Sequence, residues 1–124
     1  MRITTFNDFG GEVDVSVIVH PDRQPFDEYE GMPLAKVKLV EIARWEAAEF
    51  QLVEIEAGGA FPMHTSPQVA FCQIVRGRGK LGLPGGREIA YEGPELFIFH
   101  PGSYHDWHSI EEDTLLSVCL VSLS

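Results

Sequence analysis

The sequence of 124 residues lacks the features that would place it in several familiar classes. No apolar run reaches the roughly 18 residues that a membrane-spanning helix needs. Residues 1–7 contain no apolar core long enough for a secretory signal peptide, so none is expected. There is no glycine-rich phosphate loop, no Gly-x-Ser-x-Gly elbow and no Cys-x-x-Cys pair. These absences exclude P-loop nucleotide binding, the serine-hydrolase elbow and thioredoxin-like redox chemistry.

Basic residues are also scarce, with 9 Lys and Arg against 19 Asp and Glu, which leaves a formal net charge of −10. A nucleic-acid partner would require a basic face, and so would an anionic membrane surface. Neither partner is expected. The only two cysteines, Cys72 and Cys119, lie inside apolar runs. We therefore expect free thiols and a reducing cytoplasm.

The length suits one domain, and strand patterns fill it. Val13, Val15, Val17 and Val19 alternate with polar and apolar residues at the β-period. Residues 40–50 are the only segment with any helical character, and we interpret them as strand, turn and strand. Further strands are predicted over 37–43, 49–55, 71–75, 80–83, 87–91, 96–99, 107–110 and 115–123, with chain breaks or turns at 58–59, 84–86, 92–94 and 101–102. Many short strands separated by Gly and Pro turns indicate an all-β sandwich or barrel.

The histidines gather in two short windows, and each window joins a turn to an apolar strand. Four of the five, His64, His100, His105 and His108, fall within 58–77 and 93–108. The fifth, His20, precedes Pro21 in a predicted loop, and we assign it no role. Strands supply rigid positions and turns open them to solvent, so this placement suits a site at the mouth of a barrel.

The two windows resemble the two motifs of the cupin family. Five residues separate Gly58 from His64, and Gly77 closes the first motif, as in G-x5-H-x-H-x3–4-E-x6-G. Gly102 and His105 keep the G-x2-H spacing of the second motif. The sequence departs from the family at the second histidine (Ser66), the glutamate (Ala70), the proline (His100) and the asparagine (Ser109).

The resemblance covers about residues 36–122 and implies a fold. We expect an all-β double-stranded β-helix (cupin) barrel with N-terminal extra strands. Residues 36–124 would form the barrel. Residues 1–35 would be an extension that packs on the barrel or on a dimer partner. A homodimer is expected from the resemblance, and also because the edges of a small open barrel tend to pair with a second chain.

The resemblance also implies that His64 and His105 are metal ligands. A divalent transition ion such as zinc, iron, nickel or manganese takes three or four ligands. Gln68 and Cys72 share the strand parity of His64, whereas His108 faces the other way unless a bulge intervenes. A bound metal and a metal-free pocket therefore stay open alternatives. The candidate ligand-pocket residues are Ser66, Gln68, Cys72, Tyr104, Trp107 and His108.

Three functions remain open, and none assigns a catalytic residue or decides whether the chain is an enzyme. The first is a metal-dependent enzyme acting on a small organic molecule. The second is a non-catalytic binding barrel, walled by some of Phe61, Met63, Phe71, Phe97, Phe99 and Trp107. The third is a metal-free acid–base enzyme that uses a pocket histidine and Tyr104. Against all three stands a barrel that mainly serves oligomerisation.

Overall fold

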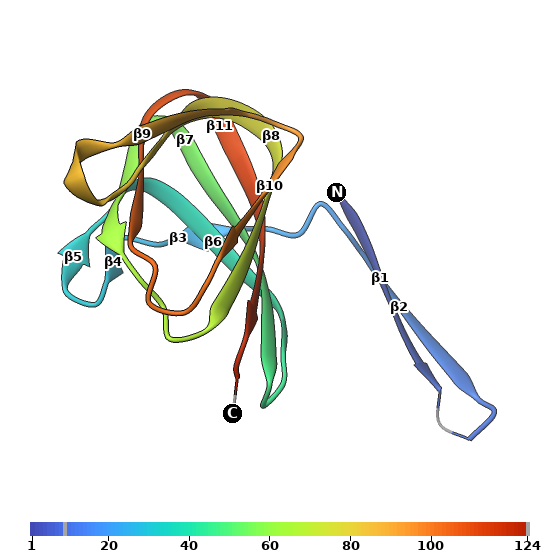
Figure 1. Ribbon diagram of the computed structural model, residues 1–124. Helices are drawn as coiled ribbons and strands as arrows, with labels where there is room; N and C mark the ends of the chain where they lie inside the picture. The colour runs from blue at the N-terminus through green and yellow to red at the C-terminus, as the bar shows by residue number, and fades with distance from the viewer. Residues whose placement is uncertain (9, 124) are drawn as a thin grey trace.

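The computed structural model describes residues 1–8 and 10–123, and this part of the chain consists almost wholly of β-strands (Figure 1). No helix in it is long and apolar enough to span a membrane. The elements are β1 (Arg2–Asp8), β2 (Val13–Val19), β3 (Gln24–Pro25), β4 (Glu28–Tyr29), β5 (Met32–Pro33), β6 (Ala35–Arg44), β7 (Ala48–His64), β8 (Val69–Gly82), the 3₁₀ turn η1 (Pro84–Gly86), β9 (Glu88–Glu92), β10 (Glu95–Phe99) and β11 (His105–Val121).

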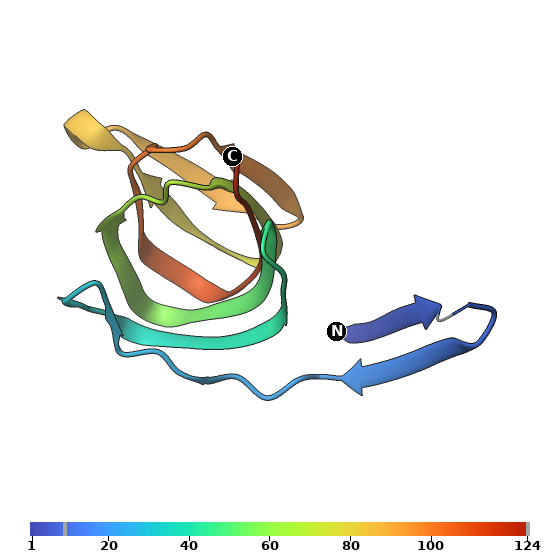
Figure 2. The same ribbon diagram turned by 90° about the horizontal axis from the view of Figure 1, so that it is seen from below.

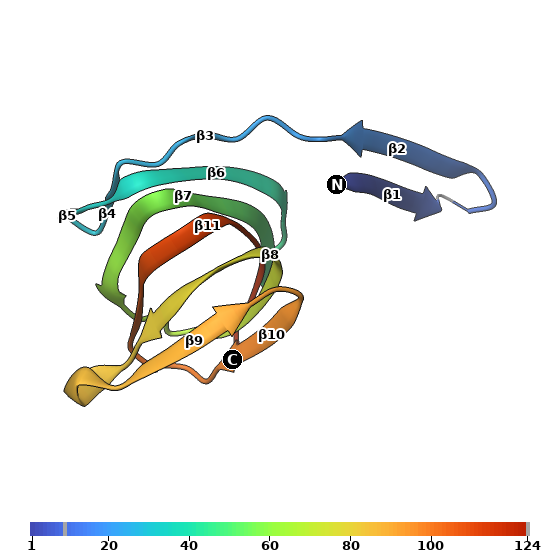
Figure 3. The same cartoon turned by 90° about the horizontal axis from the view of Figure 1, so that it is seen from above.

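One seven-stranded antiparallel sheet makes up the body of the molecule. Its order is β10-β8-β11-β7-β6-β3, and β9 pairs with β8 beside this path. The strands bend strongly and curl around a common interior, as the views from below and above show (Figures 2 and 3). The predicted all-β cupin-type barrel is confirmed, because neighbours in this sheet come from distant parts of the sequence.

The strands of the barrel are longer than the sequence pattern suggested. The predicted strands at 71–75 and 80–83 are both parts of β8, and those at 107–110 and 115–123 fall largely within β11. The predicted chain break at 58–59 is wrong, because β7 runs through it. Between the pairs Ala35↔Ala60 and Val37↔Ile55 the register shifts, so the glycines form a bulge that bends the strand.

The two glycines of this bulge are required by geometry. Gly58 has a φ of +79°, a conformation that L side chains rarely adopt. A Cβ on Gly59 would lie 2.6 Å from the carbonyl oxygen of Ala35. The strand can therefore bend here without a turn, and both of its halves stay in the same sheet.

Two predicted turns are confirmed. β6 ends at Arg44 and β7 begins at Ala48, and the Trp45 N–H donates to the Ala48 carbonyl over 2.8 Å. Residues 40–50 are thus strand, turn and strand. At the second turn η1 joins β8 to β9, and the Leu83 N–H donates to the Arg87 carbonyl over 2.8 Å.

The core occupies the interior of the curled sheet. It is built from alternate residues of β6, β7, β8 and β11, as the β-period requires. Tyr91 and Thr114 are fully buried, and their hydroxyls share a hydrogen bond of 2.7 Å. The remaining core side chains include Val37, Val53, Ile55, Phe61, Ala70, Cys72, Ile74, Leu81, Phe99, Trp107, Ile110, Leu116 and Val118.

The N-terminal residues divide into two parts with different surroundings. β1 and β2 pair only with each other, from Arg2↔Val19 to Asp8↔Val13, and this hairpin stands away from the barrel (Figure 1). Phe26 and Tyr29 instead pack against the core. The division of the chain at residue 35 stays a prediction, and residues 9 and 124 of its two parts lie outside the described residues.

Candidate functional site

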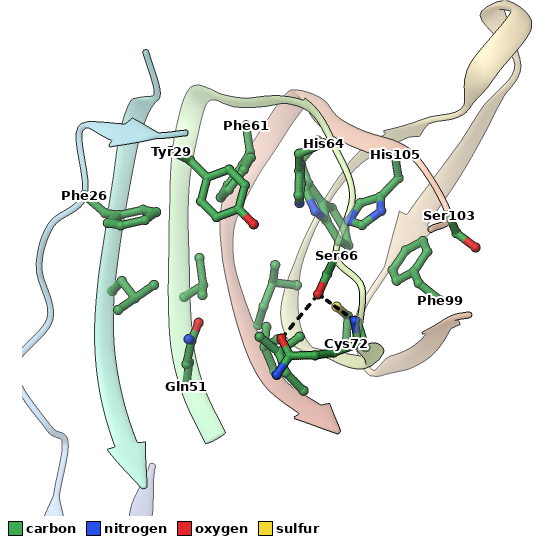
Figure 4. A pocket seen from close by; sticks show the side chains of 18 of the residues that line it. Phe26, Tyr29, Gln51, Phe61, His64, Ser66, Cys72, Phe99, Ser103 and His105 are labelled. Carbon is green, nitrogen blue, oxygen red and sulfur yellow. Dashed lines mark hydrogen bonds between the residues drawn. The ribbon is translucent and has the colours of Figure 1, made fainter. Parts of the chain in front are cut away.

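A cavity of about 400 Å³ lies inside the barrel and opens at one end (Figure 4). Its wall is mainly apolar. The apolar residues that line it are Phe26, Tyr29, Leu39, Val53, Phe61, Pro67, Ala70, Cys72, Phe99, Trp107, Leu116, Val118 and Leu120. A few polar side chains, among them His64, Ser66, Gln68 and His105, interrupt this wall. Such a lining is typical of sites for small organic molecules.

His64 and His105 face each other across two neighbouring strands. His64 ends β7 and His105 begins β11, and the two are directly paired in the sheet. Their ring centroids are 4.4 Å apart. The His64 Nδ1–H donates to the Pro62 carbonyl over 2.8 Å, which leaves its Nε2 as a hydrogen-bond acceptor.

His105 is held by aromatic packing. Its ring stacks on Phe99 with centroids 3.8 Å apart and an interplanar angle of 12°, and the Trp107 ring meets it edge-on. The residue is 5% exposed, and its buried Nδ1 has no hydrogen-bond partner among the described residues. A buried polar atom without a partner is costly, and one at a cavity wall is available to a ligand.

Both histidines are neutral at pH 7. Burial lowers the pKa of His105 to about 4, and the neighbouring His64 lowers it further than burial alone would. Burial also lowers the pKa of His64, although its hydrogen bond to Pro62 acts in the opposite direction. The pair is thus an uncharged polar group inside an apolar cavity.

The structure brings four of the six predicted pocket residues to the cavity wall, namely Ser66, Gln68, Cys72 and Trp107. The Ser66 hydroxyl bonds the Gln68 side chain over 3.3 Å and accepts the Gln68 N–H over 3.1 Å, so the two form a local polar cluster. Burial raises the pKa of the Cys72 thiol to about 12, and it stays protonated at neutral pH.

The other two predicted pocket residues lie elsewhere. Tyr104 is largely exposed and does not line the cavity. His108 is on the outside of the barrel, where its Nδ1 lies 2.6 Å from Asp106 and its Nε2 lies 2.9 Å from Glu88. These carboxylates raise the pKa of His108, the hydrogen bond to Asp106 most of all. Three residues along a strand reverse the facing of a side chain, which explains why His105 and His108 part.

Of the six residues proposed for the wall, Phe61, Phe99 and Trp107 line the cavity and the other three do not. Phe71 points outward because it alternates with Cys72 along β8. The sequence interpretation also missed Phe26 and Tyr29. It placed them in a surface loop, yet the Tyr29 ring lies 5.5 Å from that of His64. Two aromatics in an otherwise acidic, proline-containing segment were the available signal.

The side chains around the cavity do not complete a set of metal ligands. Within the residues described, no group of three or more His, Cys, Asp or Glu side chains could hold a metal ion. His64 and His105 supply two imidazoles, and the protonated Cys72 thiol is a poor ligand. A tightly bound transition ion takes three or four ligands, so the donor set falls short by at least one.

The curled antiparallel barrel and the cavity at its open end define a small cupin domain. Within that class, the family model described as the AraC-like ligand binding domain, a cupin-type family, matches residues 52–120. The match takes in β11 and β8, with the histidine pair and most of the cavity wall. The chain belongs to this family.

Solved structures support the same fold at low identity. The cupin domain of Schizosaccharomyces pombe Cnp3 is 14% identical with a TM-score of 0.74, covering 98% of this chain and 88% of that one. A cupin 2 conserved barrel domain protein from Rhodopseudomonas palustris is 20% identical with a TM-score of 0.68, covering 100% and 81%. The polyketide cyclase RemF from Streptomyces resistomycificus is 14% identical with a TM-score of 0.69, covering 82% and 74%. No curated protein matches the chain.

Proposed function

We propose that the barrel binds a small, uncharged and largely apolar organic molecule, and that it does so without a tightly held metal ion. The observation that carries this proposal is the pair of neutral histidines in the apolar cavity, one of which has a buried Nδ1 without a partner. The membership of a family described as ligand-binding supports the same function.

The histidine pair sets the chemistry of the ligand. His64 Nε2 is an acceptor, so it suits a hydroxyl or an N–H on the ligand. His105 Nδ1 satisfies its own hydrogen-bonding capacity on the same polar group. The aromatic rings of Phe61, Phe99 and Trp107 suit a flat ring or an unsaturated chain. A charged group would lose its hydration in this apolar wall without a charged partner.

The two enzyme hypotheses receive less support. A metal-dependent reaction would need ligands beyond the two histidines, and the cavity wall does not provide them. A metal-free acid–base reaction needs a base with a pKa near neutrality. His105, with a pKa of about 4, is a weak base, and Tyr104 lies outside the cavity. A homodimer and a cytoplasmic location stay predictions.

Binding is tested with 1-naphthol as the probe and its charged relative 1-naphthoate as the comparison. We expect 1-naphthol to raise the unfolding temperature of the wild-type chain and 1-naphthoate to leave it unchanged. His105→Leu, which keeps an apolar wall, should weaken 1-naphthol binding about tenfold, as the loss of one hydrogen bond implies. His108→Gln, outside the cavity, is the matched control. Equal binding of both probes, or of none, contradicts the proposal.

The metal question has its own measurement, which is elemental analysis of protein purified without a metal-chelating tag. We expect far less than one zinc, iron, nickel or manganese per chain. A near-stoichiometric ion that is lost in His64→Ala/His105→Ala would overturn the metal-free part of the proposal. The identity of that ion would then choose the reactions to assay.

A further inference from the structure

The N-terminal hairpin has an apolar face that nothing in its own chain covers. In register along β1 and β2, one face carries Phe6 and four valines, and the other carries mostly polar side chains. We call the first of these the valine face; it consists of Phe6, Val13, Val15, Val17 and Val19. Its members are between 46% and 68% exposed. A two-stranded hairpin alone is marginally stable in water, so this face needs a partner.

A second uncovered apolar surface lies on the outside of the barrel. On β10 and β8 the residues that alternate with the cavity wall point outward, and Ile98 is the cross-strand neighbour of Phe71. Phe71, Leu96 and Ile98 are 37%, 54% and 52% exposed. We call these three residues the outer patch. Along the same face β11 adds Cys119 and Ser117, paired with Phe71 and Gln73, and none of these side chains is charged.

The hairpin is fixed so that it leaves the barrel. Residues 20–23 connect β2 to β3 and cross the outer wall, where Arg23 bonds Glu54 over 2.9 Å. Arg76 bonds the same carboxylate over 3.2 Å. Glu54 is itself 9% exposed, so this ion pair lies mostly out of water. The hairpin then projects beyond the barrel, as seen from above (Figure 3).

We propose that the valine face of the hairpin packs on the outer patch of a second copy of this chain, with the two copies exchanging hairpins reciprocally. Both surfaces occur in one chain, so a two-fold pair uses each surface twice and leaves neither open. The exchange goes beyond ligand binding in the cavity and does not depend on it.

Area and charge both favour a second copy as the partner. The half-exposed side chains of the two surfaces together offer roughly 700 Å² per copy, so a reciprocal pair would bury about 1,400 Å², within the range of specific interfaces. Each copy carries a net charge of −10, so two copies repel except where uncharged surfaces meet. The valine face and the outer patch are such surfaces.

The first test is the mass of the intact chain in solution at micromolar concentration, by sedimentation or light scattering. We expect twice the chain mass of 13.8 kDa. Val15→Asp/Val17→Asp in the hairpin should give the single-chain mass. Ser16→Asp, on the opposite face of the same strand, is the matched control and should stay dimeric. A wild-type monomer, or a dimer that survives Val15→Asp/Val17→Asp, overturns the proposal.

The second test identifies the receiving surface. Leu96→Asp/Ile98→Asp should also give the single-chain mass, while Ile89→Asp, at an exposed apolar residue on β9, should stay dimeric. Each variant is first checked for wild-type circular dichroism. If the double change fails that check, Leu96→Lys alone replaces it. A dimer that survives the loss of the outer patch contradicts the proposed contact.

Mixing the two dissociated variants separates this arrangement from its alternatives. The patch variant still has an intact hairpin, and the hairpin variant still has an intact patch, so the mixture should form a weaker heterodimer with one of the two contacts. Hairpin-on-hairpin or patch-on-patch dimers would not be restored in this way. A mixture that stays monomeric therefore overturns the hairpin-to-patch contact.

Discussion

The barrel cavity and the N-terminal hairpin are built from the same alternating pattern, yet they differ in what covers their apolar faces. In the barrel the curled sheet encloses its apolar face, and Trp107 is 2% exposed. In the hairpin the equivalent face is open, and Phe6 is 68% exposed. The strand period decides which residues share a face, but only enclosure decides whether that face becomes a core, a binding site or a contact surface.

The two histidines at the start of β11 repeat this contrast within one strand. His105 faces the cavity, and burial lowers its pKa to about 4. His108 faces outward between two carboxylates, and its pKa is raised. Neighbouring residues of the same type therefore titrate in opposite directions because they face different surroundings.

The largest expected effect comes from opening the enclosed region. Trp107→Ala should lower the free energy of unfolding by about 3–5 kcal/mol, since it leaves a cavity beside Tyr91, Phe97 and His105. Trp45→Ala, at a side chain 66% exposed, should change the free energy by less than about 0.5 kcal/mol. Urea unfolding measures both. Equal losses in the two variants would contradict the assignment of Trp107 to the core.

Acidification should sharpen the contrast between the two histidines. As the pH falls below 6.5 the unfolded chain takes up a proton at residue 105 before the folded chain does, so stability falls until about pH 4. For His105 the loss amounts to at most about 3 kcal/mol. His105→Gln should therefore lose less stability than the wild type between pH 7 and pH 4, in urea unfolding at each pH.

His108→Gln is the opposing control. The raised pKa of His108 stabilises the folded chain below pH 6.5, and that stabilisation is lost as the pH rises through the folded pKa. His108→Gln should therefore lose more stability than the wild type on acidification. The same pH dependence in both variants would show that the two histidines share one environment.

An intermediate effect is expected where the hairpin is tied to the barrel. Glu54→Gln should lower the free energy of unfolding by about 2 kcal/mol, because it leaves the partly buried Arg23 and its neighbour Arg76 without a charged acceptor. The control is Glu56→Gln, whose exposed pair with Lys38 should contribute less than about 1 kcal/mol. A loss at Glu56 as large as that at Glu54 would argue that burial does not distinguish the pairs.

The smallest effect is expected in the hairpin itself. Val15→Thr/Val17→Thr should leave the unfolding of the barrel within about 0.5 kcal/mol of the wild type, at concentrations low enough for the chain to be monomeric. The hairpin pairs only with itself, so the barrel core is untouched. A clear loss of stability under those conditions would show that the hairpin packs on its own barrel.

Much of the fold was predictable because the signals are local. The alternation along 13–19 and the turns at 84–86 and 101–102 each depend on residues that are adjacent in the chain. The approach of His64 to His105 was expected from the cupin resemblance, and the structure places the pair in direct cross-strand register. Cys72 and Trp107 were placed at the wall by strand parity alone.

The failures occur where parity is interrupted or where distant segments meet. The glycines at 58 and 59 were interpreted as a break, since a bulge and a turn have the same local signature. Tyr29 reaches His64 from a segment that shows no strand pattern of its own. His108 turned outward because β11 is regular from His105 to His108, a fact that only the pairing with β8 reveals.

The sequence by itself determined that this chain is an all-β barrel with two histidines at one end, because strand period and turn chemistry are properties of neighbouring residues. Only the tertiary structure decided which alternating faces are enclosed. It made His105 neutral, set Tyr29 beside His64 and left the valine face open. The physical reason is that burial depends on how strands far apart in the chain curl around one another, and no local pattern contains that curvature.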